Sequence, residues 1–289
     1  MIYKRRDISS ELNNNIMQLY INGVSLDDIE KLTGVSKNTL LYVLNPRKFD
    51  LKRKEIPTFK TEGEKILVIA DTHIGSHWEN LKYIDEAYET GIKENVSSCI
   101  HLGDIIQGSF NKGLDKPISY QLKTLEKVYP EVSEFETYLL MGNHDYVVFE
   151  YDKDAKILLE SKKGLHPLGY KRAYFNWNNY LFGMDHKIKQ IEDDYVIRDA
   201  GLDFIGHGHE LKIKSKDKLK APTLSDDIIN KESGAYPAFL IAEMYDNEVF
   251  VDVYNFKNNK AKVRKRNYFR KKLLEVNKVA WLNEWYINC

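Results

Sequence analysis

The chain has 289 residues with 43 basic and 43 acidic side chains, so bulk charge does not mark it as a nucleic-acid-binding protein. Hydrophobic residues make up 43% and aromatic residues 12%, which excludes a disordered chain. Two cysteines cannot build a disulfide framework, and no apolar run approaches the roughly 20 residues of a membrane span. We therefore expect a cytoplasmic protein that is not attached to a membrane. Its oligomeric state stays open.

Residues 1–45 carry the periodicity and capping signals of a small helical module. Ser25 and Ser36 can each cap a helix, and Gly34 suits the left-handed turn that ends the helix between them. A preceding helix over about 11–21 would complete three helices. One interpretation is therefore a three-helix bundle that contacts another protein.

The same segment resembles the helix-turn-helix of bacterial regulators, most specifically in the run from Thr33 to Thr39. Glu30 departs from that family, which usually has a small residue one helical turn before the glycine. A long side chain there could crowd the helix crossing or point outward. The resemblance implies a recognition helix that exposes four side chains to the major groove of DNA, namely Lys37, Asn38, Thr39 and Tyr42.

The rest of the chain divides into a linker, a large domain and a tail. Residues 46–62 contain two prolines and several basic side chains, a pattern typical of a linker. From residue 63 to 255, short apolar runs alternate with helical periodicity, as in α/β domains. Hairpin turns are predicted at 178–179 and at 246–247. The basic stretch 256–289 is predicted to be a helical extension.

Each of five short polar motifs in the large domain follows an apolar run that is predicted to be a buried strand. Ligands of an open α/β sheet bind beyond the carboxyl ends of its strands, so the motifs are expected to converge on one site. The motifs are Asp71-Thr72-His73, Gly103-Asp104, Gly142-Asn143-His144-Asp145, Asp185-His186 and Gly206-His207-Gly208-His209.

The side chains in these motifs are suited to metal binding. Carboxylates, imidazoles and one amide oxygen favour Mn, Fe or Zn and argue against a thiolate zinc site. Seven candidate ligands exceed the needs of one catalytic ion with an open position. They match two ions that share a bridging carboxylate.

The ordered set of motifs resembles the calcineurin-like metallophosphoesterase superfamily over residues 64–255. The resemblance implies an α/β fold with four layers, a double-layered β-sandwich flanked by helices, beside the small all-α helix-turn-helix module. It also implies two divalent metal ions and hydrolysis of phosphate monoesters or diesters. We expect Mn as the metal, with Fe, Zn or Ni as alternatives.

The family's residue roles can be carried over motif by motif. The resemblance implies that one ion binds Asp71, His73 and His209, that the other binds Asn143, His186 and His207, and that Asp104 bridges them. His144 is expected beside the phosphate, where it helps to protonate the leaving oxygen, and Asp145 is expected to orient His144. His77 and His101 match no motif and are predicted not to be ligands.

Lysine occupies every second position from Lys212 to Lys220, and on one strand these side chains would share a face. They could form a rail for a phosphate backbone, or a charged edge strand that prevents sheet pairing. The rail would begin at Lys212, Lys214 and Lys216. Residues 219–236 are polar and are predicted to form a flap near the site.

These features together predict a two-metal phosphodiesterase or nuclease, which attacks DNA or RNA in line with a metal-bridging hydroxide. The nucleic-acid substrate is favoured by the fused helical module and the basic strips. One alternative is a phosphomonoesterase or a small-nucleotide phosphodiesterase. The other is a DNA-binding regulator in which the metal domain serves as a scaffold.

Overall fold

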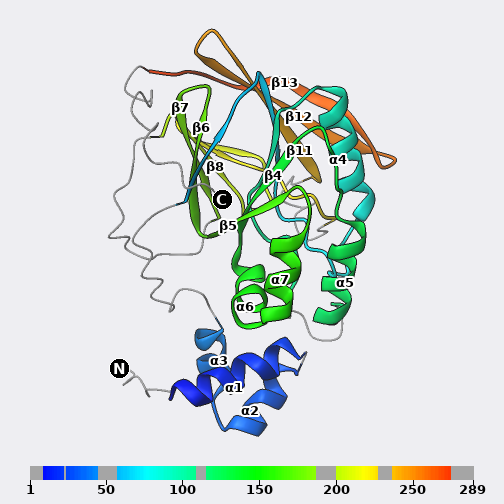
Figure 1. Cartoon of the computed structure of the whole chain (residues 1–289), viewed down its shortest axis with the longest axis vertical. Helices are drawn as coiled ribbons and strands as arrows, with labels where there is room; N and C mark the ends of the chain where they lie inside the picture. Colours follow the sequence, from blue (N-terminus) through cyan, green and yellow to red (C-terminus); the bar gives the residue numbers. More distant parts are fainter. Residues whose placement is uncertain are drawn as a thin grey trace.

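The computed structural model describes residues 9–22, 24–44, 57–108, 115–186, 200–226 and 236–274. The N-terminal helices lie against one end of an α/β body that is built around two sheets (Figure 1). No helix within the described ranges is long and apolar enough to span a lipid bilayer.

Three short helices form the N-terminal module: α1 (Ser10–Ile21), α2 (Leu26–Thr33) and α3 (Lys37–Val43). Ser25 Oγ accepts the N–H of Asp28 at 3.2 Å, and Ser36 Oγ accepts the N–H of Thr39 at 3.4 Å. Gly34 ends α2 in the left-handed region, with φ at 68°. The three helices, the two serine caps and the glycine turn expected from the sequence are all present.

The side chain of Glu30 reaches from α2 to the start of α3. Its Oε1 atom accepts the backbone N–H of Lys37 at 2.8 Å, so its carboxylate lies at the start of α3. Anionic side chains stabilise that end of a helix, because its first N–H groups are unpaired. Glu30, which replaces the small residue usual in helix-turn-helix proteins, thus stabilises the turn between α2 and α3.

The larger sheet combines parallel strands at its centre with an antiparallel edge. Strands β2, β3, β4 and β5 run parallel, while β11, β12 and β13 extend the sheet as antiparallel neighbours of β2. In spatial order the strands are β13 (Lys260–Lys272), β12 (Glu248–Lys257), β11 (Ala238–Tyr245), β2 (Lys65–Ile69), β3 (Ser98–His101), β4 (Glu136–Met141) and β5 (Leu165–Tyr170).

The smaller sheet faces the first one. In spatial order it contains β1 (Thr58–Thr61), β6 (Arg172–Trp177), β7 (Tyr180–Asp185), β8 (Leu202–Ile205), β10 (Lys218–Lys220) and β9 (Lys212–Ser215). The predicted hairpin turns at 178–179 and 246–247 are confirmed, since they join β6 to β7 and β11 to β12.

Two apolar layers hold the body together. Between the sheets, Val68 and Leu140 pack with Phe175, Phe182 and Phe204. On the outer face of the larger sheet, a second cluster joins the strands to four helices. These helices are α4 (Leu81–Lys93), α5 (Ile118–Val128), α6 (Asn143–Tyr151) and α7 (Lys153–Ser161). The described helices of the body thus cover one sheet only, so the described residues show three of the four expected layers (Figure 1).

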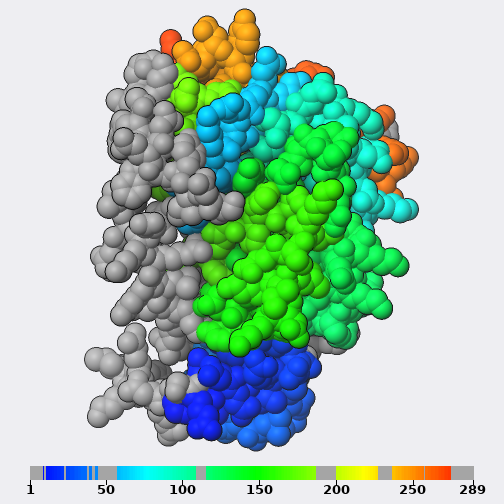
Figure 2. Space-filling model, in the orientation of Figure 1, coloured from blue at the N-terminus to red at the C-terminus, as the bar shows by residue number. Residues whose placement is uncertain are grey.

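The N-terminal module packs on α6. Ile16 and Met17 of α1 are fully buried and belong to the same apolar cluster as Val148 of α6. Gln18 Nε2 donates a hydrogen bond to the carbonyl oxygen of Tyr151 at 3.4 Å. Figure 2 shows the blue atoms of the module pressed against the green atoms of the body.

Three expectations about where the large domain begins and ends, and about the segment that follows it, are wrong. The expected linker 46–62 contributes its end, β1, to the smaller sheet as a parallel neighbour of β6. The domain expected to end at 255 continues through β12 and β13. The basic stretch after 256 forms β13 where a helix was expected, because Ala261 and Val263 alternate with charged side chains at the period of a strand. Residues 275–289 lie outside the described ranges.

The lysine-rich stretch 212–220 is two strands and not one. β9 and β10 pair antiparallel around a turn at 216–217, so the five lysines do not share one strand face. β9 lies at the edge of the smaller sheet and is exposed throughout, as the edge-strand interpretation predicts. In the expected flap, Thr223 and Ser225 are buried, and residues 227–235 lie outside the described ranges.

Candidate metal centre

The carboxyl ends of neighbouring strands bring the five motifs together, as predicted. β2, β3 and β4 are adjacent and parallel, so the loops that follow them carry Asp71, Asp104 and Asn143 to one edge. β7 and β8 are likewise parallel neighbours in the facing sheet and end just before His186 and His207. The site therefore lies where the ends of both sheets meet.

The backbone is unusual at most of these positions. Non-glycine residues rarely adopt positive φ, and such residues collect at functional sites whose surroundings hold them in place. Five of the seven candidate ligands do so: Asp71 (54°), His73 (45°), Asp104 (54°), His207 (68°) and His209 (51°). Each conformation turns a side chain sharply from the end of its strand toward the site.

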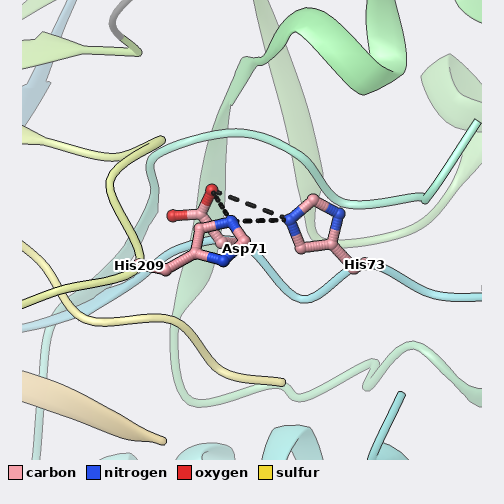
Figure 3. A group of neighbouring side chains, drawn as sticks. All are labelled: Asp71, His73 and His209. Atoms are coloured by element: carbon pink, nitrogen blue, oxygen red, sulfur yellow. Dashed lines mark hydrogen bonds and ion pairs between the residues drawn. The ribbon is translucent and has the colours of Figure 1, made fainter. Parts of the chain in front are cut away.

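Asp71, His73 and His209 form the first group of potential ligands (Figure 3). The Nε2 atoms of His73 and His209 lie 3.0 Å apart. Asp71 Oδ1 lies 3.4 Å from Nε2 of His209 and 3.9 Å from Nε2 of His73. The three atoms thus face a common point, the arrangement that a small divalent cation requires.

Asp104, His186 and His207 form the second group. Nε2 of His186 lies 3.0 Å from Oδ2 of Asp104. The other ring nitrogen of His186, Nδ1, donates to the carbonyl oxygen of Leu102 at 2.6 Å, which orients the ring. Asp104 also belongs to a third group, with His73 and His144, whose potential ligand atoms lie within 4.8 Å of one another. A single carboxylate therefore stands between the two groups.

Several buried polar atoms at the site have no hydrogen-bond partner among the described residues. They are Asp71 Oδ1, Asp104 Oδ2, Asn143 Oδ1 and His186 Nε2. Buried polar atoms are nearly always hydrogen-bonded, so a cluster of bare lone pairs indicates a bound cation. Two carboxylates, an amide oxygen and imidazole nitrogens are the donors that divalent transition metals accept. The residues fit the expected metals.

Two of the candidate histidine ligands, His73 and His207, have protonation states that suit metal binding. Burial, together with nearby His144 and His209, lowers the pKa of His73 to about 3, and burial beside His186 lowers the pKa of His207 to about 4. Both rings are thus neutral at pH 7, with a free lone pair. Burial alone would raise the pKa of Asp71 and Asp104, but the adjacent histidines His209 and His186 reverse this and lower both. The two carboxylates are therefore ionised. For His186, burial lowers the pKa, but the ionised Asp104 outweighs burial and raises it to about 9, so that a metal ion there would displace a proton.

Glycines next to the ligands allow the loops to approach closely. A Cβ atom on Gly142 would lie 2.1 Å from Oδ1 of Asp104, and one on Gly103 would lie 2.4 Å from Nδ1 of His186. Neither space admits a side chain. These glycines of the motifs are therefore required by packing around the ligands.

His144 lies at the site, and its ring contacts the backbone of Gln107. Its ring nitrogen Nδ1 lies 2.7 Å from the carbonyl oxygen of Gln107, and its backbone N–H donates to Oδ1 of Asp104 at 2.9 Å. The carboxylate oxygens of Asp145 accept the N–H groups of Ile106 and Gly142 at 3.0 and 2.8 Å. Gln107 O is thus a hydrogen-bond partner of the His144 ring, and Asp145 ties two loops together. That Asp145 also orients His144 stays a prediction.

His101 is a supporting residue that the sequence motifs do not reveal. It belongs to none of the groups of potential ligands and lies fully buried behind them. The N–H of Gly103 points to Nδ1 of His101 at 3.2 Å, and Nε2 lies 3.3 Å from Oγ1 of Thr72. His101 thus connects the loop of Asp104 to the loop that carries Asp71 and His73. A polar residue inside an apolar strand run was the available signal.

The predicted nucleic-acid contacts lie on α3, on β9 and in the turn that follows β9. Nζ of Lys37 forms an ion pair with Asp27 at 2.9 Å, and Oγ1 of Thr39 lies 2.9 Å from Oγ of Ser36. Asn38 and Tyr42 lie in α3, and their side chains are outside the described set. Lys212 and Lys214 are exposed on β9, and Lys216 follows in the turn. Contact of these residues with nucleic acid stays a prediction.

A family model described as calcineurin-like phosphoesterase matches residues 64–247. No curated protein matches the chain. Among solved structures, vacuolar protein sorting 29 from Cryptosporidium parvum is 18% identical, with a TM-score of 0.43 over 70% of this chain and 95% of that one. YfcE, a phosphoesterase from E. coli, is 12% identical, with a TM-score of 0.44 over 70% of this chain and 97% of that one.

Proposed function

The chain belongs to the calcineurin-like phosphoesterase family, and we propose that it is a two-metal phosphodiesterase that cleaves nucleic acid. The observation that carries the proposal is the place of Asp104 between two groups of potential ligands. A carboxylate shared in this way lets two ions bind side by side. Two ions act on the two oxygens of an in-line phosphoryl displacement, which a single ion does less well.

The ligands are divided between two positions. Asp71, His73 and His209 would hold one ion, and His186 and His207 would hold the other together with the unpartnered Oδ1 of Asn143. Asp104 would contact both. The neutral amide of Asn143 keeps the total negative charge of the ligands low, so the ions stay strongly electrophilic. Mn is the metal that we expect, with Fe, Zn and Ni as alternatives.

The chain's own residues prepare the substrate for attack. When bound, the two ions activate water at neutral pH and neutralise charge on the phosphate. Gln107 O holds the Nδ1–H of His144, so that in the doubly protonated ring Nε2–H would be the group that gives its proton to the leaving oxygen. The backbone N–H of His144 holds Asp104 Oδ1, which fixes the bridging carboxylate relative to that imidazole.

The choice of nucleic acid as substrate is supported by the modules around the site. The N-terminal helices have the caps and the glycine turn of a helix-turn-helix, and we propose that α3 presents Lys37, Asn38, Thr39 and Tyr42 to DNA. The exposed lysines of β9 follow His209 in the chain and would contact phosphates. Both features would supply positively charged or polar side chains to a nucleic-acid backbone.

Hydrolysis of bis-p-nitrophenyl phosphate and of p-nitrophenyl phosphate, each with Mn, tests the chemistry, and labelled single-stranded DNA and RNA test the substrate. We expect turnover of the diester and cleavage of at least one nucleic acid. Turnover of the monoester alone would show a phosphatase. Diester turnover without cleavage of DNA or RNA would show that the nucleic-acid substrate is wrong.

A further inference from the structure

One end of β13 carries basic side chains without acidic partners. β13 contains eight Lys or Arg residues and no acid. Four of these cations form ion pairs: Lys260 with Glu86, Arg266 with Asp252, Arg270 with Glu248 and Lys271 with Asp217. Lys262, Arg264, Lys265 and, at the far end of the strand, Lys272 form none with the residues that the structure describes. Most of the paired cations therefore lie toward the end of the strand, and three unpaired ones lie together near its start.

Tyrosine rings lie beneath two of these cations. The guanidinium carbon of Arg264 lies 4.8 Å from the ring centre of Tyr236, and Nζ of Lys265 lies 5.0 Å from that of Tyr268. Tyr236 is 46% exposed, which is high for a large side chain. We call Lys262, Arg264, Lys265, Tyr236 and Tyr268 the β13 patch. It combines unneutralised charge with aromatic surface.

Side chains of β13 alternate between the two faces of the sheet, and this alternation exposes the patch to solvent. Val263 packs into the apolar cluster on the helix side of the larger sheet. Its neighbours Lys262 and Arg264 therefore point to the opposite face, and both are exposed. Solvent-exposed cations on that face are free to meet a polyanion.

The patch and the metal centre lie at the same end of the larger sheet. β13, β12, β11 and β2 are successive antiparallel neighbours, so the start of β13 lies at the end where β2 leads to Asp71. Ala238, at the start of β11, donates its N–H to Thr223 O at 3.0 Å, and Thr223 Oγ1 donates to Asp71 O at 2.9 Å. Three strand spacings separate β13 from β2, roughly 15 Å.

We propose that the β13 patch binds single-stranded nucleic acid beside the metal centre. Lys262, Arg264 and Lys265 would contact phosphates, because no described acid competes for them. Tyr236 and Tyr268 would stack on bases, which only an unpaired strand exposes. Delivery of a phosphodiester to the metal centre rests on the proposed function, whereas binding of the strand does not.

Binding is measured with full-length protein that carries His144→Gln and is loaded with Mn, so that the strand stays intact. The probes are fluorescein-labelled 20-mers of dT and of U, followed by anisotropy at several salt concentrations. The patch variant is Lys262→Gln/Arg264→Gln/Lys265→Gln. The matched control is Lys123→Gln/Lys127→Gln/Lys153→Gln, which removes three exposed cations on α5 and α7.

We expect the patch variant to bind about tenfold or more weakly than the control. Each phosphate contact to a single strand contributes about 0.7 to the slope of log affinity against log salt, so the slope should become shallower by about 2. Tyr236→Ala should weaken binding roughly 5-fold or more, since stacking of one base contributes about 1–3 kcal/mol. Unchanged far-UV circular dichroism establishes that each variant is folded.

Wild-type affinity and slope in the patch variant would overturn the proposal. Equal affinity for duplex DNA, with no effect of Tyr236→Ala, would overturn it as well. Hydrolysis of bis-p-nitrophenyl phosphate separates this proposal from the proposed function. Diester hydrolysis without oligonucleotide binding would reject only the proposal that the β13 patch binds a single strand. Oligonucleotide binding through the patch without diester hydrolysis would reject only the proposed phosphodiesterase function.

Discussion

The ring nitrogen Nδ1 of His144 lies 2.7 Å from the carbonyl oxygen of Gln107, which belongs to the loop that follows Asp104. A carbonyl oxygen can only accept, so Nδ1 carries a proton, and the opposite nitrogen, Nε2, is the one left for the proposed proton transfer to the substrate. The same loop thus supplies Asp104, which stands between the two ligand groups, and holds the Nδ1–H of the candidate acid. Hydrolysis should depend on His144 even though His144 holds no assigned ion.

His144→Gln is expected to lower kcat for the diester about 10²–10⁴-fold, the contribution of a positioned general acid. Metal content should stay at the wild-type value, because the ligands remain. Kinetics and metal analysis of the same preparation measure both. His166→Gln is the matched control, since His166 is exposed and pairs with Glu136 at the surface. Loss of metal together with activity would instead make His144 a ligand.

Asp104→Asn removes the carboxylate that stands between the two ligand groups. An amide has one acceptor oxygen and no charge, so it cannot bridge two cations as a carboxylate does. We expect the number of tightly bound Mn ions to fall from two to one or none, measured by calorimetry. Asp154→Asn, in the exposed first turn of α7, should retain two ions. Two ions in Asp104→Asn would contradict the shared-carboxylate arrangement.

His101→Phe tests the support behind the ligands. Burial lowers the pKa of His101 to about 3, so the ring is neutral. Since Gly103 N–H donates to Nδ1, the proton lies on Nε2 and points to Thr72, whose hydroxyl donates to Ile105 O at 2.9 Å. We expect Mn affinity to fall about 10–100-fold, as for other residues that orient metal ligands.

Two further variants separate the effect of the His101 hydrogen bonds from the effect of the space that its ring fills. His101→Gln retains an acceptor and a donor and should recover part of the affinity, whereas Thr72→Val removes only one link and should have a smaller effect. Calorimetric titration with Mn measures all three. Equal affinity in His101→Phe and wild type would show that the ligands hold their geometry without His101.

Much of the site could be predicted because its residues follow strand ends. Asp71, Asp104 and Asn143 come directly after apolar runs, and parallel pairing brings such positions together. The role of Asp145 could not be predicted in this way, because its N–H donors, Ile106 and Gly142, are set by how two loops pack.

The first and last strands of the fold, β1 and β13, were harder to predict for a different reason. The run from Lys260 to Lys272 is so basic that its charge obscures the alternation of Ala261 and Val263. β13 forms because β12 offers it a hydrogen-bonding edge, with Asp252 and Glu248 to pair with its arginines. β1 likewise depends on a distant partner, β6. Strands that depend on such pairing have weak local signals.

Glu86 of α4 should stabilise the fold in a pH-dependent way. Burial raises the pKa of Glu86, but the Lys260 ammonium and the N–H of Ala261 outweigh burial and lower it below the ordinary value of 4.5. A folded-state pKa below the unfolded one means that the carboxylate stabilises above about pH 4.5. That contribution is lost as the pH falls through the folded-state pKa.

Glu86→Gln is therefore expected to lower the free energy of unfolding by about 1–2 kcal/mol at pH 7, where the charged hydrogen bonds are intact. The difference from wild type should shrink as the pH falls below about 4.5. Urea denaturation with EDTA at each pH measures it. Glu89→Gln, whose exposed carboxylate pairs with Lys93, should change the free energy by less than about 0.5 kcal/mol. If the difference in free energy of unfolding between wild type and Glu86→Gln grew on acidification, the expected direction of the pH dependence would be wrong.

Asp145→Asn distinguishes between two roles of the Asp145 carboxylate, which are to tie two loops together and to orient His144. Both carboxylate oxygens accept backbone N–H groups, so an amide NH₂ at either place would face another donor. Leaving one buried N–H without an acceptor costs about 1–3 kcal/mol, and urea denaturation in EDTA should show a loss of that size. Because the tie joins the loop of Asp104 to the loop of Asn143, Mn affinity should fall too. Wild-type stability combined with a large loss of kcat would instead assign the orientation of His144 to Asp145 and reject Gln107 as the residue that sets it.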